Sequence, residues 1–167
     1  MRDCTTIIAI GANLPHPDQK SPLETCRWAV GRLAALPGLN LVACSRWYGS
    51  APVPASAQPD YVNGVALFTG EWEPHALLEQ LHGIEAEAGR VRGKVNAART
   101  LDIDLLAMGD LIVAEPSLTL PHPRLHGRAF VLLPLMDVAP GWVHPLRGRT
   151  AASLLDDVDR SGVARLA

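Results

Sequence analysis

The N-terminal part of the chain combines a strand pattern with a helix pattern. The continuous apolar run 5–10 predicts a buried strand, which Gly11-Ala12-Asn13 closes. Further along, Ser21 offers an N-cap oxygen, Pro22 a preset first helical position and Glu24 the second half of a capping box. We therefore expect a helix that starts at Pro22 and stops at 36–38, with an apolar stripe of Leu23, Cys26, Val30 and Leu33.

The middle of the chain repeats this combination. Residues 39–50 are rich in strand formers, and a proline-rich loop at 52–59 leads into a second strand pattern at Tyr61–Phe68. One face of that strand carries Tyr61, Asn63, Val65 and Leu67, and the other carries Val62, Ala66 and Phe68. The next helix is expected from Pro74 to Gly89, with Leu77, Leu78, Leu81, Ile84 and Ala88 at helical spacing. Glu85 lies on the inward edge of this stripe, where an acid needs a partner or a ligand.

The segment Arg99–Leu106 carries the most informative alternation. Leu101, Ile103 and Leu105 are expected on one face of a strand, and Asp102 and Asp104 on the other. Two carboxylates on adjacent same-face positions raise each other's pKa unless a positive group lies between them. Their hard oxygens suit Mg²⁺, which takes one or two protein carboxylates and completes its shell with water and substrate phosphates. For an isolated Asp-x-Asp, an exposed strand end whose acids face water is the more common arrangement, so the flanking residues decide between the two.

The C-terminal third predicts shorter elements. We expect a short strand at Leu111–Val113, a short helix at Ala129–Leu133 that ends near Pro134, and a final amphipathic helix at Thr150–Val158. Helices that cross between strands, with other strands joined by short loops, favour an α+β fold built on one mostly antiparallel sheet.

Composition narrows the class of protein. With 167 residues, of which 48% are apolar, we expect one domain spanning 1–167. The net charge of −2 provides no general attraction for nucleic acid or for an anionic membrane. The three cysteines are widely spaced, which argues against a disulfide framework, and no signal-peptide core or apolar span of about 20 residues is present. We therefore expect a soluble, cytoplasmic protein that binds small molecules as a monomer.

Positive charge is nevertheless concentrated locally. The segment 90–99 holds four cations and no acid, and it leads directly into the paired aspartates. A second acid-free basic segment occupies 120–128. His122 and His126 have the spacing of a helical metal pair, but Pro121 and Pro123 disfavour a helix and no Glu or Cys completes a zinc set. A phosphate site next to a Mg²⁺ site is the interpretation that these segments favour.

Several separated motifs together resemble one family. They are Ile10-Gly-Ala-Asn-Leu14, Gln58-Pro-Asp-Tyr-Val-Asn63, Arg99-Thr-Leu-Asp-Ile-Asp-Leu-Leu106 and Pro121-His-Pro-Arg-Leu-His-Gly-Arg-Ala-Phe130 followed by Val131-Leu-Leu-Pro-Leu135. In this order they are similar to the 6-hydroxymethyl-7,8-dihydropterin pyrophosphokinases of folate biosynthesis, from about residue 7 to about residue 155. The resemblance implies a ferredoxin-like α/β plait and transfer of pyrophosphate from ATP to the pterin hydroxymethyl oxygen, with release of AMP.

The resemblance also assigns roles to residues. Asp102 and Asp104 would ligate two Mg²⁺ ions that bridge the ATP phosphates, and Arg90 and Arg99 would hold those phosphates. The set expected around the nucleotide is His82, Glu85, Arg92, Leu105, Thr119, His122 and Arg128. The set expected around the pterin is Ser50, Ala51, Val53, Tyr61, Asn63 and Phe130, with Phe130 stacking on the ring. No dedicated general base stands out, and either metal coordination of the hydroxyl or an aspartate could serve.

The chain departs from the family pattern at a few positions. Asn96-Ala97-Ala98-Arg99 replaces the usual Trp-Gly-Pro-Arg, so we expect the basic loop to close less tightly over the substrate. Pro123 stands where the family usually has a Tyr, which removes one contact to the nucleotide. Two alternatives from other classes remain: an Asp-x-Asp glycosyltransferase, and a non-catalytic ferredoxin-like module that binds nucleotide or RNA. With only Phe68, Phe130, Tyr48 and Tyr61 for stacking, the chain is poorly equipped for sheet-based RNA recognition.

Overall fold

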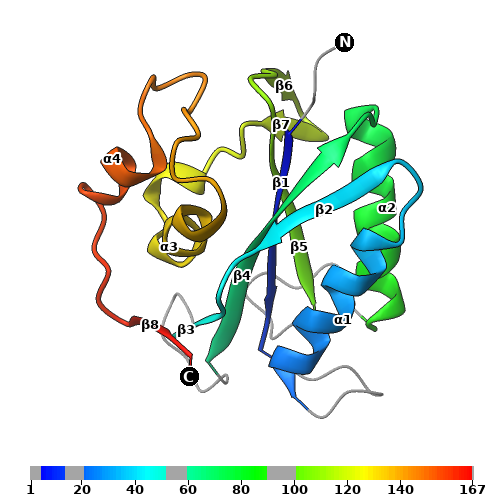
Figure 1. Cartoon of the computed structure of the whole chain (residues 1–167), viewed down its shortest axis with the longest axis horizontal. Helices are drawn as coiled ribbons and strands as arrows, with labels where there is room; N and C mark the ends of the chain where they lie inside the picture. The colour runs from blue at the N-terminus through cyan, green and yellow to red at the C-terminus, as the bar shows by residue number, and fades with distance from the viewer. Residues whose placement is uncertain (1–4, 14–20, 52–59, 90–100, 167) are drawn as a thin grey trace.

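The main elements follow a β-α-β-β-α-β order (Figure 1). The computed structural model describes residues 5–13, 21–51, 60–89 and 101–166. Within these ranges the order is β1 (Thr5–Ala12), α1 (Pro22–Ala34), β2 (Leu39–Cys44), β3 (Tyr48–Ser50), β4 (Tyr61–Gly70), α2 (Pro74–Glu87) and β5 (Asp102–Met108). The remaining elements are β6 (Val113–Glu115), β7 (Leu118–Leu120), the 3₁₀ turn η1 (Leu125–Gly127), α3 (Ala129–Val138), α4 (Ala151–Leu155) and β8 (Val163–Arg165).

The central sheet has the strand order β5-β1-β4-β3-β8, and β2 also pairs with β4. Its paired neighbours are antiparallel. Helix α1 connects β1 to β2, but these two strands are not neighbours, because β4 lies between them in the sheet. This is the split arrangement of ferredoxin-like folds. The expected fold class is therefore confirmed, including the mostly antiparallel sheet.

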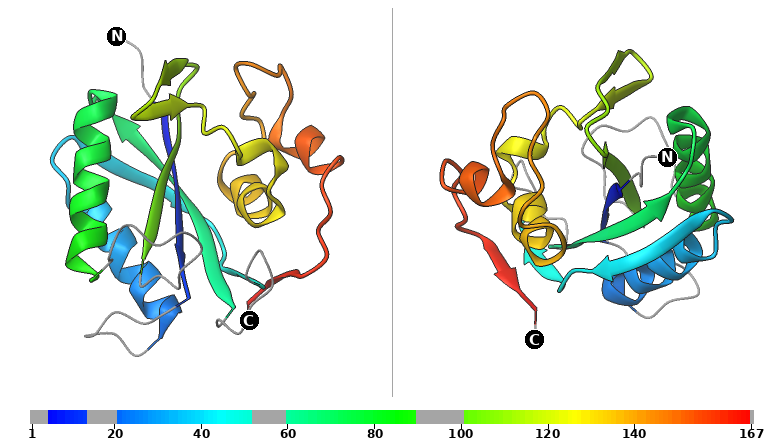
Figure 2. Two further views of the ribbon diagram at one scale, coloured as in Figure 1. Left: turned by 180° about the vertical axis from the view of Figure 1, so that it is seen from behind. Right: turned by 45° about the horizontal axis from the view of Figure 1, so that its top comes forward.

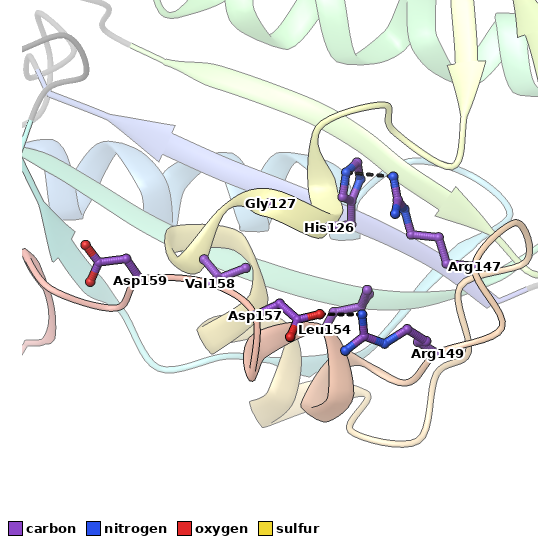
Figure 3. Close-up of a pocket in the computed structure, with 8 residues that line it drawn as sticks. All are labelled: His126, Gly127, Arg147, Arg149, Leu154, Asp157, Val158 and Asp159. Carbon is purple, nitrogen blue, oxygen red and sulfur yellow. Dashed lines mark hydrogen bonds and ion pairs between the residues drawn. The ribbon is translucent and has the colours of Figure 1, made fainter.

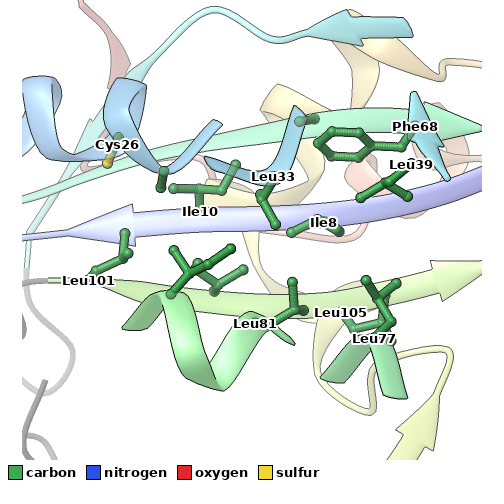
Figure 4. Packing of buried hydrophobic residues seen from close by; sticks show 14 of the residues in the cluster. Ile8, Ile10, Cys26, Leu33, Leu39, Phe68, Leu77, Leu81, Leu101 and Leu105 are labelled. Carbon is green, nitrogen blue, oxygen red and sulfur yellow. The ribbon is translucent and has the colours of Figure 1, made fainter. Parts of the chain in front are cut away.

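Helices cover both faces of the sheet, with α1 and α2 on one face and α3 and α4 on the other (Figures 1 and 2). On the α1/α2 face, Ile8, Ile10 and Phe68 belong to one buried cluster (Figure 4). On the α3/α4 face, Val65 and Leu132 belong to a second cluster. The predicted alternation along β4 is confirmed, because its odd-numbered apolar residues join the second cluster and its even-numbered ones the first.

The predicted start of α1 is confirmed. Ser21 Oγ accepts a hydrogen bond from the Glu24 backbone N–H at 3.2 Å, and Pro22 opens the helix. The buried face is formed by Thr25, Cys26, Ala29 and Leu33, so two members of the expected stripe, Leu23 and Val30, are only half-buried. For α2, Leu77, Leu81, Ile84 and Ala88 of the expected stripe are buried together with Glu85, whereas Leu78 is half-buried and the helix ends at Glu87 rather than Gly89.

The predicted end of α3 at Pro134 is wrong, because the helix continues to Val138. Pro134 has no N–H for the Phe130 carbonyl, and a proline in a helix interior costs about 3 kcal/mol. Val131, Leu132 and Leu135 are 5%, 0% and 0% exposed in the second cluster. Since burying such a side chain contributes about 1.5–3 kcal/mol, packing on the sheet outweighs the local preference.

Other C-terminal predictions need correction. The strand expected at Leu111–Val113 is wrong, because Leu111 and Ile112 are irregular and exposed, and the chain instead forms the β6–β7 hairpin with its turn at 116–117. The last helix begins as expected, with Thr150 Oγ1 accepting from the Ser153 N–H at 3.2 Å, but it ends at Leu155 rather than Val158. None of the described helices has the length and apolar character needed to cross a bilayer.

Candidate active site

The strand register places an amide and two acids on one face of the sheet. Gly11 of β1 pairs with Asn63 of β4 on one side and with Asp102 of β5 on the other. Two residues along, Ala9 pairs with Val65 and with Asp104 in the same way. Directly opposed residues in antiparallel strands project from the same face, so both acids share the α3/α4 face with Asn63 and Val65. Leu101, Ile103 and Leu105 belong to the opposite cluster, as predicted.

Only residues with small side chains lie between the amide of Asn63 and the two acids. Asn63 and Asp102 are separated by two strand spacings, which amount to about 10 Å. Gly11 and Ala9 occupy the strand between them, and neither carries a side chain longer than a methyl group. A Cβ on Gly11 would lie 3.0 Å from Asn63 Oδ1, so even an alanine would crowd the amide. This row therefore joins an amide and two acids through residues with small side chains.

The amide end is tied together by hydrogen bonds. Asn63 Nδ2 donates to Ser50 Oγ at 2.8 Å, and these residues are 8% and 7% exposed. Ser50 pairs with Tyr61 across β3 and β4, which brings three of the predicted pterin residues together. Tyr48 pairs with Asn63, and its hydroxyl donates to Asp137 Oδ2 at 2.9 Å. Burial, followed by this hydrogen bond, raises the pKa of Tyr48 above its ordinary value.

The other predicted pterin residues lie in different situations. Ala51 follows β3 and is exposed, and Val53 lies outside the described residues. Phe130 is half-buried on α3 against the second cluster, and the Arg128 guanidinium carbon lies 5.4 Å from its ring centroid. One face of the Phe130 ring is thus near a cation, which is a cation–π geometry.

The acid end opens into a cleft of about 310 Å³. Its lining brings together seven predicted residues: His82, Glu85, Asp102, Asp104, Leu105, Thr119 and His122. Arg128 does not line this cleft. Arg90, Arg92 and Arg99 lie outside the described residues.

His122 enters the cleft as a neutral side chain. Its backbone N–H donates to the Leu106 carbonyl at 2.8 Å, which attaches the segment to β5. Its Nδ1 accepts from the Arg124 backbone N–H at 3.2 Å, so the hydrogen of the neutral ring is assigned to Nε2. Burial, followed by the charge of Arg128, lowers the pKa of His122 to about 4, although Asp102 acts in the opposite direction. At neutral pH His122 therefore offers an uncharged N–H donor.

The hydrogen-bond partner of Glu85 could not be predicted from the sequence. Its Oε2 accepts a hydrogen bond from the Ile103 backbone N–H at 2.8 Å, and the residue is 1% exposed. Strand β5 is an edge strand of the sheet, and the Ile103 N–H points away from its neighbour β1. The inward acid on α2 thereby satisfies an edge donor on the strand that carries Asp102 and Asp104, and it also lines the cleft.

Sequence reasoning missed the contribution of the β6–β7 hairpin. Pro116 and Ser117 in its turn line the cleft beside Thr119. The ring of His75, at the start of α2, links to this hairpin through Nε2 and Glu115 Oε2 at 2.9 Å. The signal was the alternation on both sides of Pro116-Ser117, which is a hairpin pattern.

The donor set at the acid end suits a hard divalent cation. Among the residues that the structure describes, no group of three or more His, Cys, Asp or Glu side chains is arranged to hold a metal ion. Asp102 and Asp104 are half-buried and project from one face. A pair of carboxylates with space for water and phosphate oxygens is the kind of site that Mg²⁺ occupies, whereas zinc needs more protein ligands.

Comparisons with solved structures agree on the fold. The HPPK-DHPS protein of Plasmodium falciparum, in a crystal structure with SDX-DHP, matches with a TM-score of 0.70 at 12% identity. The match covers 97% of this chain and 47% of that chain, so this chain spans about half of that protein's length. A second HPPK-DHPS structure, in complex with substrates, matches with a TM-score of 0.72 over 99% of this chain and 47% of its own.

Sequence comparisons identify the family. A model described as 7,8-dihydro-6-hydroxymethylpterin-pyrophosphokinase (HPPK) matches residues 7–140. A protein of Pseudomonas aeruginosa named 2-amino-4-hydroxy-6-hydroxymethyldihydropteridine pyrophosphokinase is 40% identical, over 95% of this chain and 94% of its own length. One of the same name from Synechocystis sp. is 36% identical, over 94% of this chain and 77% of its own. This chain therefore belongs to the HPPK family.

Proposed function

We propose that this chain transfers the pyrophosphoryl group of ATP to 6-hydroxymethyl-7,8-dihydropterin along the row of residues that joins Asn63 to the Asp102–Asp104 pair. The observation that carries the proposal is the register row that sets a buried amide and two acids on one face, about 10 Å apart across a floor of small residues. A flat heterocycle at one end and a metal-bound phosphate chain at the other would meet within this distance.

Two carboxylates anchor the phosphate end. Asp102 and Asp104 would hold Mg²⁺, as two ions, because both project into the same cleft. When bound there, the ions would neutralise phosphate oxygens and so stabilise the charge that develops during the displacement. Glu85 fixes the strand that carries these acids by accepting the Ile103 N–H. The pair therefore stays in register with β1 and with Asn63.

Nucleotide binding is assigned to the cleft beside the acids. Leu105 and Thr119 would contact the nucleotide from β5 and β7, with His82 from α2. His122 would donate from its neutral ring, because its low pKa leaves the Nε2–H in place at neutral pH. Arg90, Arg92 and Arg99 would neutralise the phosphates from the basic segment, and Arg128 would approach from the end of η1.

Pterin binding is assigned to the amide end. Asn63 would pair with the hydrogen-bonding edge of the pterin, and Ser50 would keep the amide in one orientation. Tyr61 lies beside Ser50, and Phe130 would stack on the ring from α3. Ala51 and Val53 would line the same pocket. A ring fixed in this way presents its hydroxymethyl oxygen toward the acids.

The reaction needs positioning and charge more than covalent help. The pterin hydroxymethyl oxygen forms a bond to the β-phosphorus, the bond from that phosphorus to the α,β-bridging oxygen breaks, and AMP leaves. The hydroxyl proton passes to an acceptor in the cleft, for which a half-buried aspartate is available. Holding both reactants in line supplies much of the rate enhancement in phosphoryl transfer.

A three-component assay tests this function. The full chain is incubated with ATP, Mg²⁺ and 6-hydroxymethyl-7,8-dihydropterin, and the nucleotide products are separated. We expect AMP to form only when all three components are present. Formation of ADP would indicate an ordinary kinase, and pterin or nucleotide binding without turnover would indicate a binding module. Either result would overturn the proposal.

A further inference from the structure

A second cleft lies on the other side of the 3₁₀ turn η1. It measures about 350 Å³ and is lined by His126, Gly127, Arg147, Arg149, Leu154, Asp157, Val158 and Asp159 (Figure 3). None of these residues lines the cleft that contains Asp102 and Asp104. The proposed reaction therefore gives this second cleft no role.

The two arginines of this cleft differ in their hydrogen-bond partners. Arg149 is paired with a carboxylate and uses three of its five N–H donors within the fold, because it donates to Asp157 Oδ2 at 2.5 Å, to Ser153 Oγ at 2.9 Å and to the Ser153 carbonyl at 2.6 Å. Arg147 instead donates to His126 Nε2 at 2.9 Å and has no carboxylate partner among the residues that the structure describes. A guanidinium has five N–H donors, so most of those on Arg147 remain available to a ligand.

A hydrogen-bonded turn fixes the backbone at Arg147. The buried ring of His144, 3% exposed, accepts the backbone N–H groups of Leu146 and Arg147 at its Nδ1, each at 3.2 Å. The Gly148 N–H donates to the His144 carbonyl at 2.8 Å, which closes the turn. The backbone that presents Arg147 is therefore fixed by this buried side chain, whose ring also makes edge contacts with the rings of Trp142 and His126.

The charge distribution divides the cleft into two ends. Asp159 lies at the opposite end from Arg147 and His126 (Figure 3), and its oxygens accept the backbone N–H and the hydroxyl of Ser161. Asp157 is paired with Arg149. The Arg147–His126 end is thus positive without a nearby compensating acid, and the apolar side chains of Leu154 and Val158 lie between the two ends.

We propose that Arg147 and His126 bind the phosphate group of inorganic phosphate or of a small phosphate monoester in this second cleft. A guanidinium fork matches two oxygens of such a group, and a protonated imidazole supplies a donor to a third. A carboxylate has only two oxygens and would leave one donor without a partner. Leu154 and Val158 would contact the carbon part of an ester.

Binding of this group is linked to protonation of His126. In the free protein, burial and then the charge of Arg147 lower the pKa of His126, so the ring is neutral and accepts from Arg147. The charged or titratable groups that face it are Arg147 and His144, with Arg149, Asp157 and Asp159 further around the cleft. A phosphate in contact with both Arg147 and His126 favours the imidazolium, so binding is expected to raise the pKa of His126.

Histidine NMR tests the proposal on the full chain. The ring C–H signals of His126 and His122 are followed during titration with inorganic phosphate at constant ionic strength. We expect the His126 signal to shift saturably and the pKa of His126 to increase by about 1 or more, while the His122 signal stays unchanged. A shift confined to His122, or a linear shift of all histidines, would overturn the proposal.

Variants and other anions sharpen the test. R147Q is expected to abolish the saturable shift, whereas R160Q removes an exposed arginine outside the cleft and should behave as wild type. An equal response in both variants would contradict the site. Glycerol phosphate binding several-fold more tightly than inorganic phosphate would identify an ester ligand, and equal affinities would identify free phosphate. Acetate binding as tightly as phosphate would overturn the assignment to phosphate.

Discussion

The two ends of the proposed substrate site, the pterin end at Asn63 and the phosphate end at Asp102 and Asp104, differ in how far they are formed before substrate binds. At the pterin end, Asn63 and Ser50 are buried and already hydrogen-bonded to each other. At the phosphate end, two like-charged carboxylates are half-buried beside an open cleft. A preformed amide selects a ligand by the shape of its hydrogen-bonding edge, whereas a carboxylate pair acquires its chemistry only with cations. We infer that specificity resides at one end and most of the catalytic power at the other.

The largest effect is expected at the phosphate end. Asp102→Asn or Asp104→Asn removes a negative metal ligand while keeping the side-chain shape. Loss of metal stabilisation worth about 4 kcal/mol lowers kcat by roughly a thousandfold. Steady-state assays of AMP formation measure the loss, and pterin affinity by fluorescence should change by less than about twofold. Asp156→Asn, on an exposed acid, is the control. Activity like that of the wild type in either variant would remove the assignment of the pair.

A smaller and complementary effect is expected at the pterin end. Asn63→Ala removes the recognition group and leaves Ser50 Oγ without its donor. Hydrogen bonds of this kind contribute about 1–3 kcal/mol, so the KM for the pterin should rise about 10- to 100-fold. The KM for ATP should stay the same. Asn40→Ala, on the exposed part of β2, is the matched control. If the KM for ATP rose as much as that for the pterin, the two ends would not be separate.

The floor between the ends offers a more graded test. Gly11→Ala places a Cβ 3.0 Å from Asn63 Oδ1, which forces the amide to move by a few tenths of an ångström. We expect the KM for the pterin to rise roughly threefold to tenfold, since a displaced amide weakens part of its hydrogen bonding. Gly31→Ala, on α1, has open space around the new Cβ and should have no effect on either KM. A Gly11→Ala variant with unchanged pterin kinetics would show that the amide position is not critical.

The smallest predicted effect concerns the β6–β7 hairpin, whose turn lines the cleft that we assign to the nucleotide. Hydrogen bonding to Glu73, and also the charge of Glu115, raises the pKa of His75 above its ordinary value of 6.5. The charged form that binds Glu115 is thus complete below about pH 6.5 and is lost as the pH rises through the raised pKa. Glu115→Gln should raise the KM for ATP by about twofold at pH 6 and not at pH 9, because exposed ion pairs are weak.

A matched neutralisation controls this last prediction. Asp156→Asn removes an exposed acid next to α4, on the face of the sheet opposite to α2. A twofold effect of Glu115→Gln that persisted at pH 9, or an equal effect of Asp156→Asn, would contradict a role for the His75–Glu115 contact.

Local signals predicted the first part of the fold well. The Ser21 cap, the inward position of Glu85 and the alternation on both faces of β5 follow from periods of 3.6 and 2 residues, which are visible in a single segment. The continuation of α3 through Pro134 was not predictable in this way, because it depends on packing against a sheet formed by distant residues. Strand β8 was missed for the same reason, since it is defined by its pairing with β3.

The sequence predicted a set of candidate site residues, of which seven line one cleft, but it did not predict their arrangement. The pattern around Asp102 and Asp104 indicated a metal site, and the separated motifs indicated its partners. The shared row with Gly11 and Asn63 depends on the register of three strands, which no local pattern gives. The acceptor role of Glu85 toward Ile103 depends equally on β5 being at the end of the sheet.

A crystal structure with Mn²⁺ in place of Mg²⁺ and a non-hydrolysable ATP analogue would show whether the acid pair holds the metal, because anomalous scattering locates the ion. We expect Mn²⁺ bound to the carboxylates of both Asp102 and Asp104 at about 2.1 Å, with the triphosphate on the far side of the ions and the nucleoside in the cleft beside Thr119 and His122. Metal and nucleotide bound elsewhere, with both acids in contact only with water, would contradict this expectation.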